Sequence, residues 1–258
     1  MENKLALITG ASGGIGEAFG HVLAAEGCDL ILIARRDQEL HRVKGVITAK
    51  HPVAVHVLAI DLSASGAVDY LMAEMARRNL VPGIVINNAG FGLIGSSAEL
   101  SRDEQLNMID LNVRVLTDIT LRLLPAMIAH KSGGVINVAS IAGFMPGPLM
   151  AVYFATKNYV VSLGDAMASE LRGTGVTMTT LCPGTVKTAF QARAGQTEGR
   201  STLSAFDVAS LGWAGFKSGR RVVVPGFFNH LIAYGLRMMP RRISLPFVKQ
   251  VIARRRAT

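Results

Sequence analysis

The chain has 258 residues, of which 50% are hydrophobic and 17% are charged. This composition is too apolar for a disordered chain, and the length suits one large α/β domain better than two small ones. The formal charge of +9 is unevenly spread, because residues 1–207 hold 17 basic and all 18 acidic side chains, whereas residues 208–258 hold ten basic ones and no acid. The folded body lacks interleaved stacking aromatics and a basic stripe, so we expect no nucleic-acid partner.

The two cysteines, Cys28 and Cys182, lie far apart without a CxxC pattern or a histidine cluster nearby. We therefore expect neither a disulfide framework nor a metal site. The N-terminus lacks the basic and apolar regions of a signal peptide, and the longest mostly apolar run, residues 222–236, is shorter than the roughly 20 residues of a membrane-spanning helix. These patterns predict a cytoplasmic protein.

Seven short runs rich in β-branched residues alternate with longer stretches of helical periodicity. They span residues 5–9, 30–34, 53–60, 84–87, 135–139, 176–181 and 221–224. Most are apolar on both faces, which is typical of a parallel sheet covered by helices on both sides. The pattern predicts an α/β chain with a doubly wound Rossmann fold and a seven-stranded parallel sheet over residues 1–226, followed by a basic, apolar extension over residues 227–258.

Two helix starts are marked by capping residues. Ser101 with Glu104 forms a capping-box pattern that predicts a helix to about His130, and Ser204 predicts another to about Lys217.

A glycine-rich turn, TGASGGIG, follows the first predicted strand and precedes a helix. Such a turn brings backbone N–H groups against a pyrophosphate at a helix N-terminus. The spacing of Gly10, Gly14 and Gly16 is GxxxGxG and not GxGxxG, so the generic dinucleotide pattern does not match. A merely tight turn is the alternative, but the strand before, the helix after and a second strand ending roughly 20 residues later favour a dinucleotide site.

The end of the second predicted strand carries Arg35 and Arg36 where an acidic residue would accept a ribose 2′-hydroxyl. Guanidinium groups pair with phosphate through charge-assisted hydrogen bonds, whereas a carboxylate would repel it. This favours NADP(H). In the alternative, the arginines are solvated and Asp37 binds the hydroxyl of NAD(H).

Ser140 ends the fifth predicted strand, and Tyr153 and Lys157 lie four residues apart on the following helix, so their side chains share one face. A phenol with a pKa near 10 is a poor acid or base at neutral pH, but a nearby ammonium stabilises the phenolate. Tyr153 thereby becomes a candidate proton shuttle. Taken singly, YxxxK also occurs as an ordinary exposed pair.

Together these motifs carry a family resemblance. TGASGGIG, Asn87-Asn88-Ala89-Gly90, Asn112, Ser140, Tyr153-x-x-x-Lys157 and Pro183-Gly184, in this order, resemble the classical short-chain dehydrogenase/reductases over residues 4–225. The resemblance implies that Tyr153 exchanges a proton with the substrate oxygen and that Lys157 lowers the Tyr153 pKa and holds the nicotinamide ribose. It also implies that Ser140 hydrogen-bonds the carbonyl and that Asn112 completes a proton relay through water.

The resemblance also places the cofactor. It implies Asp61 and Leu62 at the adenine, residues 88–90 beside the adenosine ribose, and residues 183–188 at the nicotinamide carboxamide. The expected cofactor-binding residues are Gly10, Ser12, Gly13, Gly14, Ile15, Gly16, Arg35, Arg36, Asp61, Leu62, Asn88, Ala89, Gly90, Tyr153, Lys157, Pro183, Gly184, Val186 and Thr188.

Apolar residues near these motifs predict an apolar substrate pocket. The candidates are Phe91, Leu93, Ile94, Phe144, Met145, Leu149 and Met150. Methionine and phenylalanine accommodate bulky or chain-like ligands, and no Arg or Lys is obviously placed to bind a small carboxylate. Several of these residues could equally be ordinary core. A segment at about 187–203 is a candidate lid.

The last 32 residues mix aromatic and aliphatic side chains with arginine and contain Pro240 and Pro246, which we expect to break the helical pattern. Phe247, Val248, Val251 and Ile252 fall on one helix face, with basic residues beside them. This is typical of an interfacial helix on an anionic membrane. An oligomer contact, a cover over the substrate cleft and a solvated end are the alternatives.

The sequence thus favours an NADP(H)-dependent oxidoreductase that transfers a hydride between nicotinamide and the carbonyl or alcohol carbon of an apolar ketone, aldehyde or 3-oxoacyl thioester. An NAD-dependent alcohol dehydrogenase of the same family and a non-catalytic cofactor-sensing protein are the alternatives. A sensor would be expected to lack Tyr153 or Lys157, and both are present. We also expect a homodimer or homotetramer.

Overall fold

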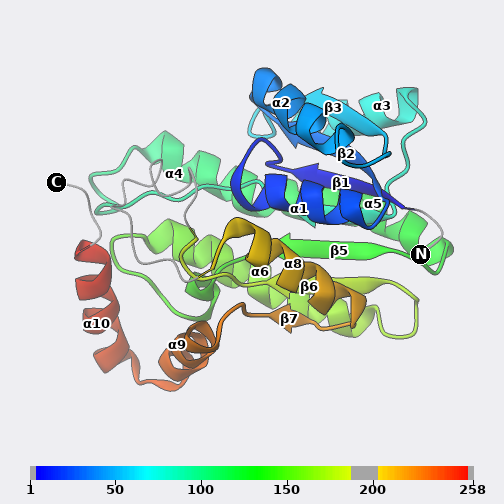
Figure 1. Cartoon of the computed structure of the whole chain (residues 1–258). Coiled ribbons are helices and arrows are strands. Elements are labelled where there is room, and N and C mark those ends of the chain that lie inside the picture. The colour runs from blue at the N-terminus through cyan, green and yellow to red at the C-terminus, as the bar shows by residue number, and fades with distance from the viewer. Residues whose placement is uncertain (1–3, 187–202, 255–258) are drawn as a thin grey trace.

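The computed structural model describes residues 4–186 and 203–254. Its centre is a seven-stranded parallel sheet in the order β3-β2-β1-β4-β5-β6-β7 (Figure 1). The strands are β1 (Leu5–Thr9), β2 (Asp29–Ala34), β3 (Val55–Ala59), β4 (Ile84–Asn87), β5 (Gly134–Val138), β6 (Thr177–Leu181) and β7 (Val222–Val223). Each lies within two residues of its predicted bounds, and the doubly wound Rossmann fold is confirmed.

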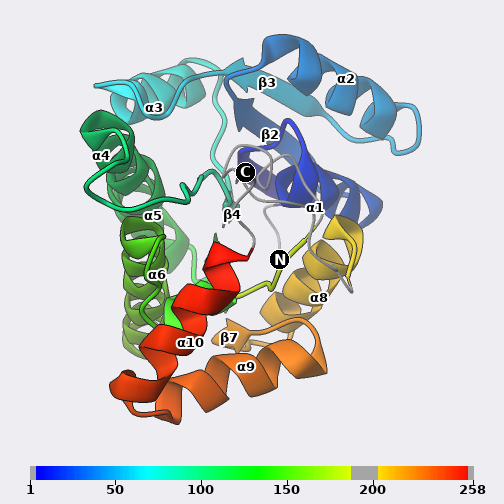
Figure 2. The same cartoon turned by 90° about the vertical axis from the view of Figure 1, so that its left-hand side faces the viewer.

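Helices cover both faces of the sheet, as its doubly apolar strands require (Figure 2). One layer contains α1 (Gly14–Ala25), α2 (Asp37–Thr48) and α8 (Ala205–Lys217), which pack Phe19, Ile47 and Trp213 against the strands. The other contains α3 (Ala67–Arg77), α5 (Leu116–Ala129) and α6 (Ala151–Glu170). Because α1 and α5 follow neighbouring strands onto opposite faces, the sheet has a switch point between β1 and β4.

Both predicted helix starts are confirmed. The Ser204 hydroxyl accepts the Asp207 N–H at 3.1 Å, and the Asp207 carboxylate accepts the Ser204 N–H at 3.0 Å, which closes a capping box. Ser101 accepts the Glu104 N–H at 3.4 Å at the start of α4 (Arg102–Ile109). The helix expected to run to about His130 is interrupted by a π-helical turn, η1 (Asp110–Val115), before α5 continues to residue 129.

The C-terminal residues form two helices, α9 (Phe227–Met238) and α10 (Arg241–Ala253), beyond the carboxyl ends of the strands (Figures 1 and 2). Pro240 separates them, as expected. The expectation that Pro246 breaks the pattern is wrong, because Pro246 lies inside α10. Only one hydrogen bond is lost to a proline there, and burial of Ser244, Val248 and Ile252 holds the helix in place. Within the described residues, no helix is long and apolar enough to span a membrane.

Candidate active site

A cavity of about 970 Å³ lies at the carboxyl ends of the strands, at the switch point between β1 and β4. Ligands of open α/β sheets bind in this crevice because the loops leaving the strands diverge there. Its wall is formed by the glycine turn after β1, the ends of β2 to β6, α6 and the two C-terminal helices.

The glycine turn is held in a conformation that needs glycine at several positions. Gly10 and Gly14 have φ of 67° and 57°, in the left-handed region that glycine adopts without strain. A Cβ on Gly16 would collide with the Gly10 carbonyl oxygen and the Asn88 amide. Gly16 therefore allows close packing of α1 on the turn and does not itself line the cavity.

Thr9 and Asn88 fasten this turn to the end of β4. The Thr9 hydroxyl accepts the N–H groups of Asn88 and Ala89 at 3.0 and 2.9 Å, and the Asn88 side-chain amide donates to the carbonyls of Thr9 and Gly10 at 3.0 and 3.2 Å. Sequence reasoning missed the role of Thr9, although its place directly before the first glycine was a usable signal. The network prearranges the turn for a pyrophosphate.

Arg36 lies over the same turn. Its guanidinium donates to the Ser12 carbonyl and hydroxyl, both at 3.2 Å. Arg35 lies 3.8 Å from the Asp61 carboxylate, and both arginines line the cavity. Asp37 is instead the first residue of α2 and lies 3.6 Å from His41. Asp37 is not among the described residues that line the cavity.

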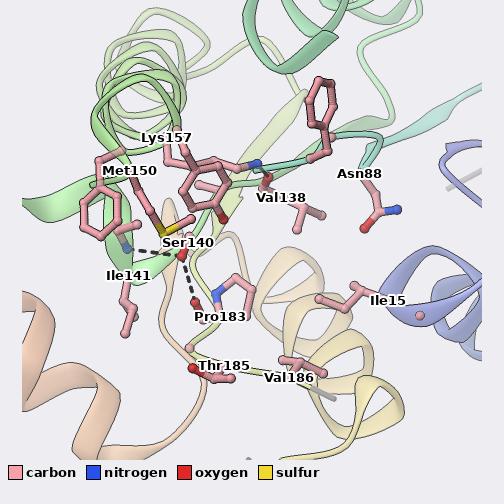
Figure 3. Close-up of a pocket in the computed structure, with 18 of the residues that line it drawn as sticks. Ile15, Asn88, Val138, Ser140, Ile141, Met150, Lys157, Pro183, Thr185 and Val186 are labelled. Atoms are coloured by element: carbon pink, nitrogen blue, oxygen red, sulfur yellow. Dashed lines mark hydrogen bonds between the residues drawn. The ribbon is translucent and has the colours of Figure 1, made fainter. Parts of the chain in front are cut away.

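Ser140, Tyr153 and Lys157 all line the cavity. Figure 3 shows Ser140 and Lys157 close together on its wall. The Ser140 hydroxyl accepts the Ala142 N–H at 3.1 Å, contacts the Pro183 carbonyl at 3.4 Å and is hydrogen-bonded to the Tyr153 hydroxyl. Lys157 donates to the Val138 carbonyl at 2.8 Å. Its Nζ lies 5.9 Å from the centroid of the Tyr153 ring.

The pKa values of this group are set by burial. Burial raises the pKa of Tyr153 to about 12, although the hydrogen bond from Ser140 acts in the opposite direction. Burial also lowers the pKa of Lys157 to about 8. The expected lowering of the Tyr153 pKa by Lys157 is not present in this structure, because the ammonium is directed to a backbone carbonyl and the phenol is desolvated.

Asn112 lies one layer behind the cavity wall, in the π-helical turn η1. Its amide donates to the Phe91 carbonyl at 2.9 Å and to the Thr156 hydroxyl at 3.1 Å, and its oxygen accepts the Phe91 N–H at 3.1 Å. The residue is 1% exposed. Asn112 is therefore placed to hold the segment after β4 against α6, and the proton relay implied by the resemblance stays a prediction.

Most of the other expected cofactor-binding residues line the cavity. The lining set contains Gly10, Ser12, Gly13, Gly14, Ile15, Asp61, Leu62, Asn88, Ala89, Gly90, Pro183, Gly184 and Val186. Thr188 and the candidate lid up to residue 202 lie outside the described residues.

The expected substrate residues divide into two groups. Phe91, Met145 and Met150 line the cavity. The other four do not: Ile94 and Phe144 are buried in the core beside the cavity, and Leu93 and Leu149 pack against that core. The Asn158 amide holds the Met145 segment on α6 by donating to the carbonyls of Ala142, Met145 and Phe154.

The C-terminal helices supply lining residues that sequence reasoning placed elsewhere or missed. The predicted face of Phe247, Val248, Val251 and Ile252 is turned to the cavity. From α9 come Leu231, Ile232 and Gly235, and Met239 directly after the helix also lines the cavity. Their spacing follows the helical period, which was a usable signal for one face.

Comparison with known proteins places this geometry in a family. The family model described as short chain dehydrogenase matches residues 4–199. The chain belongs to the short-chain dehydrogenase/reductase family. As a member of this family it is an NAD(P)-dependent oxidoreductase acting on CH–OH or carbonyl groups. Within the described residues, no group of three or more His, Cys, Asp or Glu could hold a metal ion.

Relatives of this dehydrogenase/reductase include a sulfoacetaldehyde reductase of Chromohalobacter salexigens, 38% identical over 71% of this chain and 72% of the relative. An uncharacterized oxidoreductase of Staphylococcus aureus is 35% identical over 81% of this chain and 89% of the relative. Among solved structures, a short-chain dehydrogenase from Sphingobium yanoikuyae in complex with NADPH has a TM-score of 0.82 and 27% identity, covering 90% of this chain and 91% of that one.

Proposed function

We propose that this enzyme uses NADPH to reduce the carbonyl group of a bulky or chain-like apolar ketone, aldehyde or 3-oxoacyl thioester. One observation carries the proposal. The hydroxyls of Ser140 and Tyr153 and the ammonium of Lys157 lie on the wall of a cavity that continues to a glycine turn covered by Arg36.

The protonation states of these groups suit the reductive direction. With a pKa of about 12, the Tyr153 phenol is neutral at physiological pH and can donate its proton to the substrate oxygen. The Ser140 hydroxyl lies beside it and can donate to the same oxygen as negative charge develops there. With a pKa of about 8, Lys157 is mostly protonated and can donate to ribose hydroxyls. When bound, the nicotinamide supplies the hydride.

The preference for NADPH is supported by the residues around the glycine turn. Arg36 is already oriented by Ser12, so little side-chain freedom is lost when it binds a phosphate. Asp37 is directed to His41 at the start of α2, and this weakens the alternative in which it binds the ribose of NAD(H). The related Sphingobium structure holds NADPH.

The preference for an apolar substrate is supported by the other half of the cavity. Among the described lining residues, the cations are Arg35, Arg36 and Lys157. Arg36 lies at the glycine turn and Arg35 beside Asp61, so both follow β2. Beyond Tyr153 the wall is made of methionine, phenylalanine and aliphatic side chains. A sulfonated aldehyde, the substrate in the name of the Chromohalobacter relative, would find Lys157 as the one cation among the described residues that line this half of the cavity. A Pyrenophora tritici-repentis protein named very-long-chain 3-oxoacyl-CoA reductase is 36% identical over 66% of this chain and 51% of that protein.

We further propose that the enzyme is a cytoplasmic homodimer or homotetramer, with residues 1–226 as its catalytic domain and residues 227–258 as an extension that meets a membrane surface. Assembly is supported by Leu121 on α5 and Tyr159 on α6, which are 54% and 39% exposed. These helices lie side by side on one flank of the molecule (Figure 2). Light scattering of the purified chain gives the mass that decides this.

The activity is tested by following NADPH oxidation with long-chain ketones, bulky cyclic ketones, 3-oxoacyl thioesters and small anionic aldehydes. Turnover of the apolar carbonyls is the expected result, and Tyr153→Phe should lower kcat at least 100-fold because it removes the exchangeable proton. NADPH affinity should change little in this variant. Turnover of anionic aldehydes alone would contradict the apolar substrate. Full turnover by Tyr153→Phe would remove the proton role, and NADPH binding without turnover of any carbonyl would favour the cofactor sensor.

A further inference from the structure

The surface of the C-terminal helices carries large hydrophobic side chains that face solvent. Phe227, Phe228 and Met238 of α9 are 74%, 75% and 87% exposed, and Ile243 of α10 is 60% exposed. They are the four most exposed large hydrophobic side chains of the described residues, and none of them lines the cavity. We call them the outer apolar residues. The rings of Phe227 and Phe228 contact each other, with centroids 6.1 Å apart. Large exposed apolar surface is typical of an interaction site.

On the two C-terminal helices, basic side chains accompany the outer apolar residues, and the helices themselves contain no acid. Arg241, Arg242 and Lys249 of α10 and Arg254, which directly follows it, are exposed, and no ion pair among the described residues involves them. The sequence contains no Asp or Glu after Asp207. The surface is therefore apolar and positively charged, which complements a lipid surface with anionic headgroups.

The same helices form the outer part of the cavity wall. On α9, Phe227, Leu231 and Met238 recur at the helical period. The adjacent stripe of Ile232 and Gly235, continued by Met239 after the helix, lines the cavity. Leu231 connects the outer surface with the cavity, because its side chain lines the cavity and is also 56% exposed. Phe247 of α10, 53% exposed, likewise lines the cavity. Apolar surface thus continues from the cavity to the outside of the molecule.

We propose that α9 and α10 dock on an anionic membrane through the outer apolar residues and the α10 arginines, and that the cavity receives an amphiphilic carbonyl substrate from that membrane. The substrate part of this proposal rests on the proposed function. A long apolar chain dissolved in the bilayer would pass along Leu231 and Phe247 and place its carbonyl at Ser140 and Tyr153. The hydrophobic part of the substrate would then remain out of water during transfer.

A second copy of the chain is a poorer occupant of this surface. In a twofold-symmetric dimer each patch meets its own copy, so the basic residues of one patch would face those of the other. Residues 227–258 contain seven basic residues and no acid that could pair with them. An anionic membrane supplies both partners, because its headgroups pair with the basic residues and its acyl region accepts the outer apolar residues.

The docking is tested by sedimentation of the full chain with vesicles of phosphatidylcholine alone or with about one third phosphatidylserine. The parent should bind the anionic vesicles and dissociate as salt rises, since screening weakens exposed charges. Phe227→Ser/Phe228→Ser and Arg241→Gln/Arg242→Gln should each lower the partition coefficient roughly tenfold. The matched controls are Tyr70→Ser on α3 and Lys50→Gln just after α2, because both residues are exposed and these helices lie away from α9 and α10 (Figure 2). A parent that stays in the supernatant with anionic vesicles would overturn the docking.

Light scattering without lipid measures the oligomeric mass and so tests whether a second copy of the chain occupies this surface. If Phe227→Ser/Phe228→Ser converts an oligomer into a monomer, the outer apolar residues form a subunit contact and the membrane proposal is wrong. Unchanged mass with lost vesicle binding supports the proposal.

Substrate entry is tested by comparing two ketones, a short one dissolved in water and a long-chain one dissolved in the anionic vesicles. Phe227→Ser/Phe228→Ser should reduce the rate with the vesicle-borne ketone about tenfold and leave the rate with the short ketone unchanged, because neither residue lines the cavity. If the parent and the Phe227→Ser/Phe228→Ser variant reduce the vesicle-borne ketone at equal rates, substrate entry from the membrane is wrong. Vesicle binding by a chain that oxidises NADPH with neither ketone would instead contradict the proposed function while the docking stands.

Discussion

The ammonium group of Lys157 donates a 2.8 Å hydrogen bond to the backbone carbonyl of Val138, at the end of β5. This bond anchors α6 to the sheet beside the cavity, and it holds a charged group that is only 5% exposed. Burial lowers the Lys157 pKa to about 8, so the protonated form is present at neutral pH at a cost in stability.

That cost predicts a pH dependence of stability. Because the pKa of Lys157 falls from 10.5 in the unfolded chain to about 8 in the folded protein, the unfolded state binds more protons between these values. Parent stability should therefore rise by about 2 kcal/mol from pH 7 to pH 10 relative to Lys157→Met, which has no proton to lose. Urea unfolding at the two pH values measures the difference, with Lys50→Met as the exposed control. Parallel pH profiles for parent and Lys157→Met would contradict the buried charge.

Cofactor preference should reside mainly in Arg36. Arg36→Ala should weaken NADPH binding roughly tenfold or more and leave NADH binding nearly unchanged, because it removes the charge-assisted hydrogen bonds to the 2′-phosphate. Arg35→Ala should have a smaller effect, since its guanidinium lies 3.8 Å from Asp61. Calorimetric titration with both cofactors measures the affinities. Equal affinity of the parent for NADPH and NADH would return Asp37 to the role of ribose ligand.

The geometry of Asn112 predicts a loss of stability on its removal. Asn112→Ala removes the hydrogen bonds that the Asn112 side chain makes with the N–H and carbonyl of Phe91, and should lower the free energy of unfolding by about 2 kcal/mol. Urea unfolding, with the exposed Asn107→Ala as control, gives the value. If kcat falls while stability is unchanged, Asn112 acts on the reaction directly, as a proton relay would.

The α10 helix should contribute to substrate affinity. Phe247→Ala removes apolar lining and should raise KM for a bulky apolar ketone roughly tenfold without changing KM for NADPH. Phe206→Ala is the matched control, because Phe206 is 55% exposed on α8 and does not line the cavity. An equal effect of the two variants would show that α10 does not form part of the substrate site.

The features that depend on short stretches of chain could be predicted from the sequence. The apolar runs predicted all seven strands because a strand buried on both faces needs apolar residues along its length. Ser204 and Asp207 predicted a helix start because a capping box forms within four residues. Gly10 and Gly14 predicted the turn because their positive φ values are a local requirement of the backbone.

Only the tertiary structure decided which part of the molecule each apolar face packs against. Periodicity placed Val248 and Ile252 on one side of a helix, but their burial against the cavity depends on residues more than 90 positions away, such as Phe154. The same holds for Ile94 and Phe144, which became core, and for Asn112, whose partners Phe91 and Thr156 lie 21 and 44 residues distant. A local pattern records that a side chain avoids or seeks water, whereas its partner is selected by the packing of the whole chain.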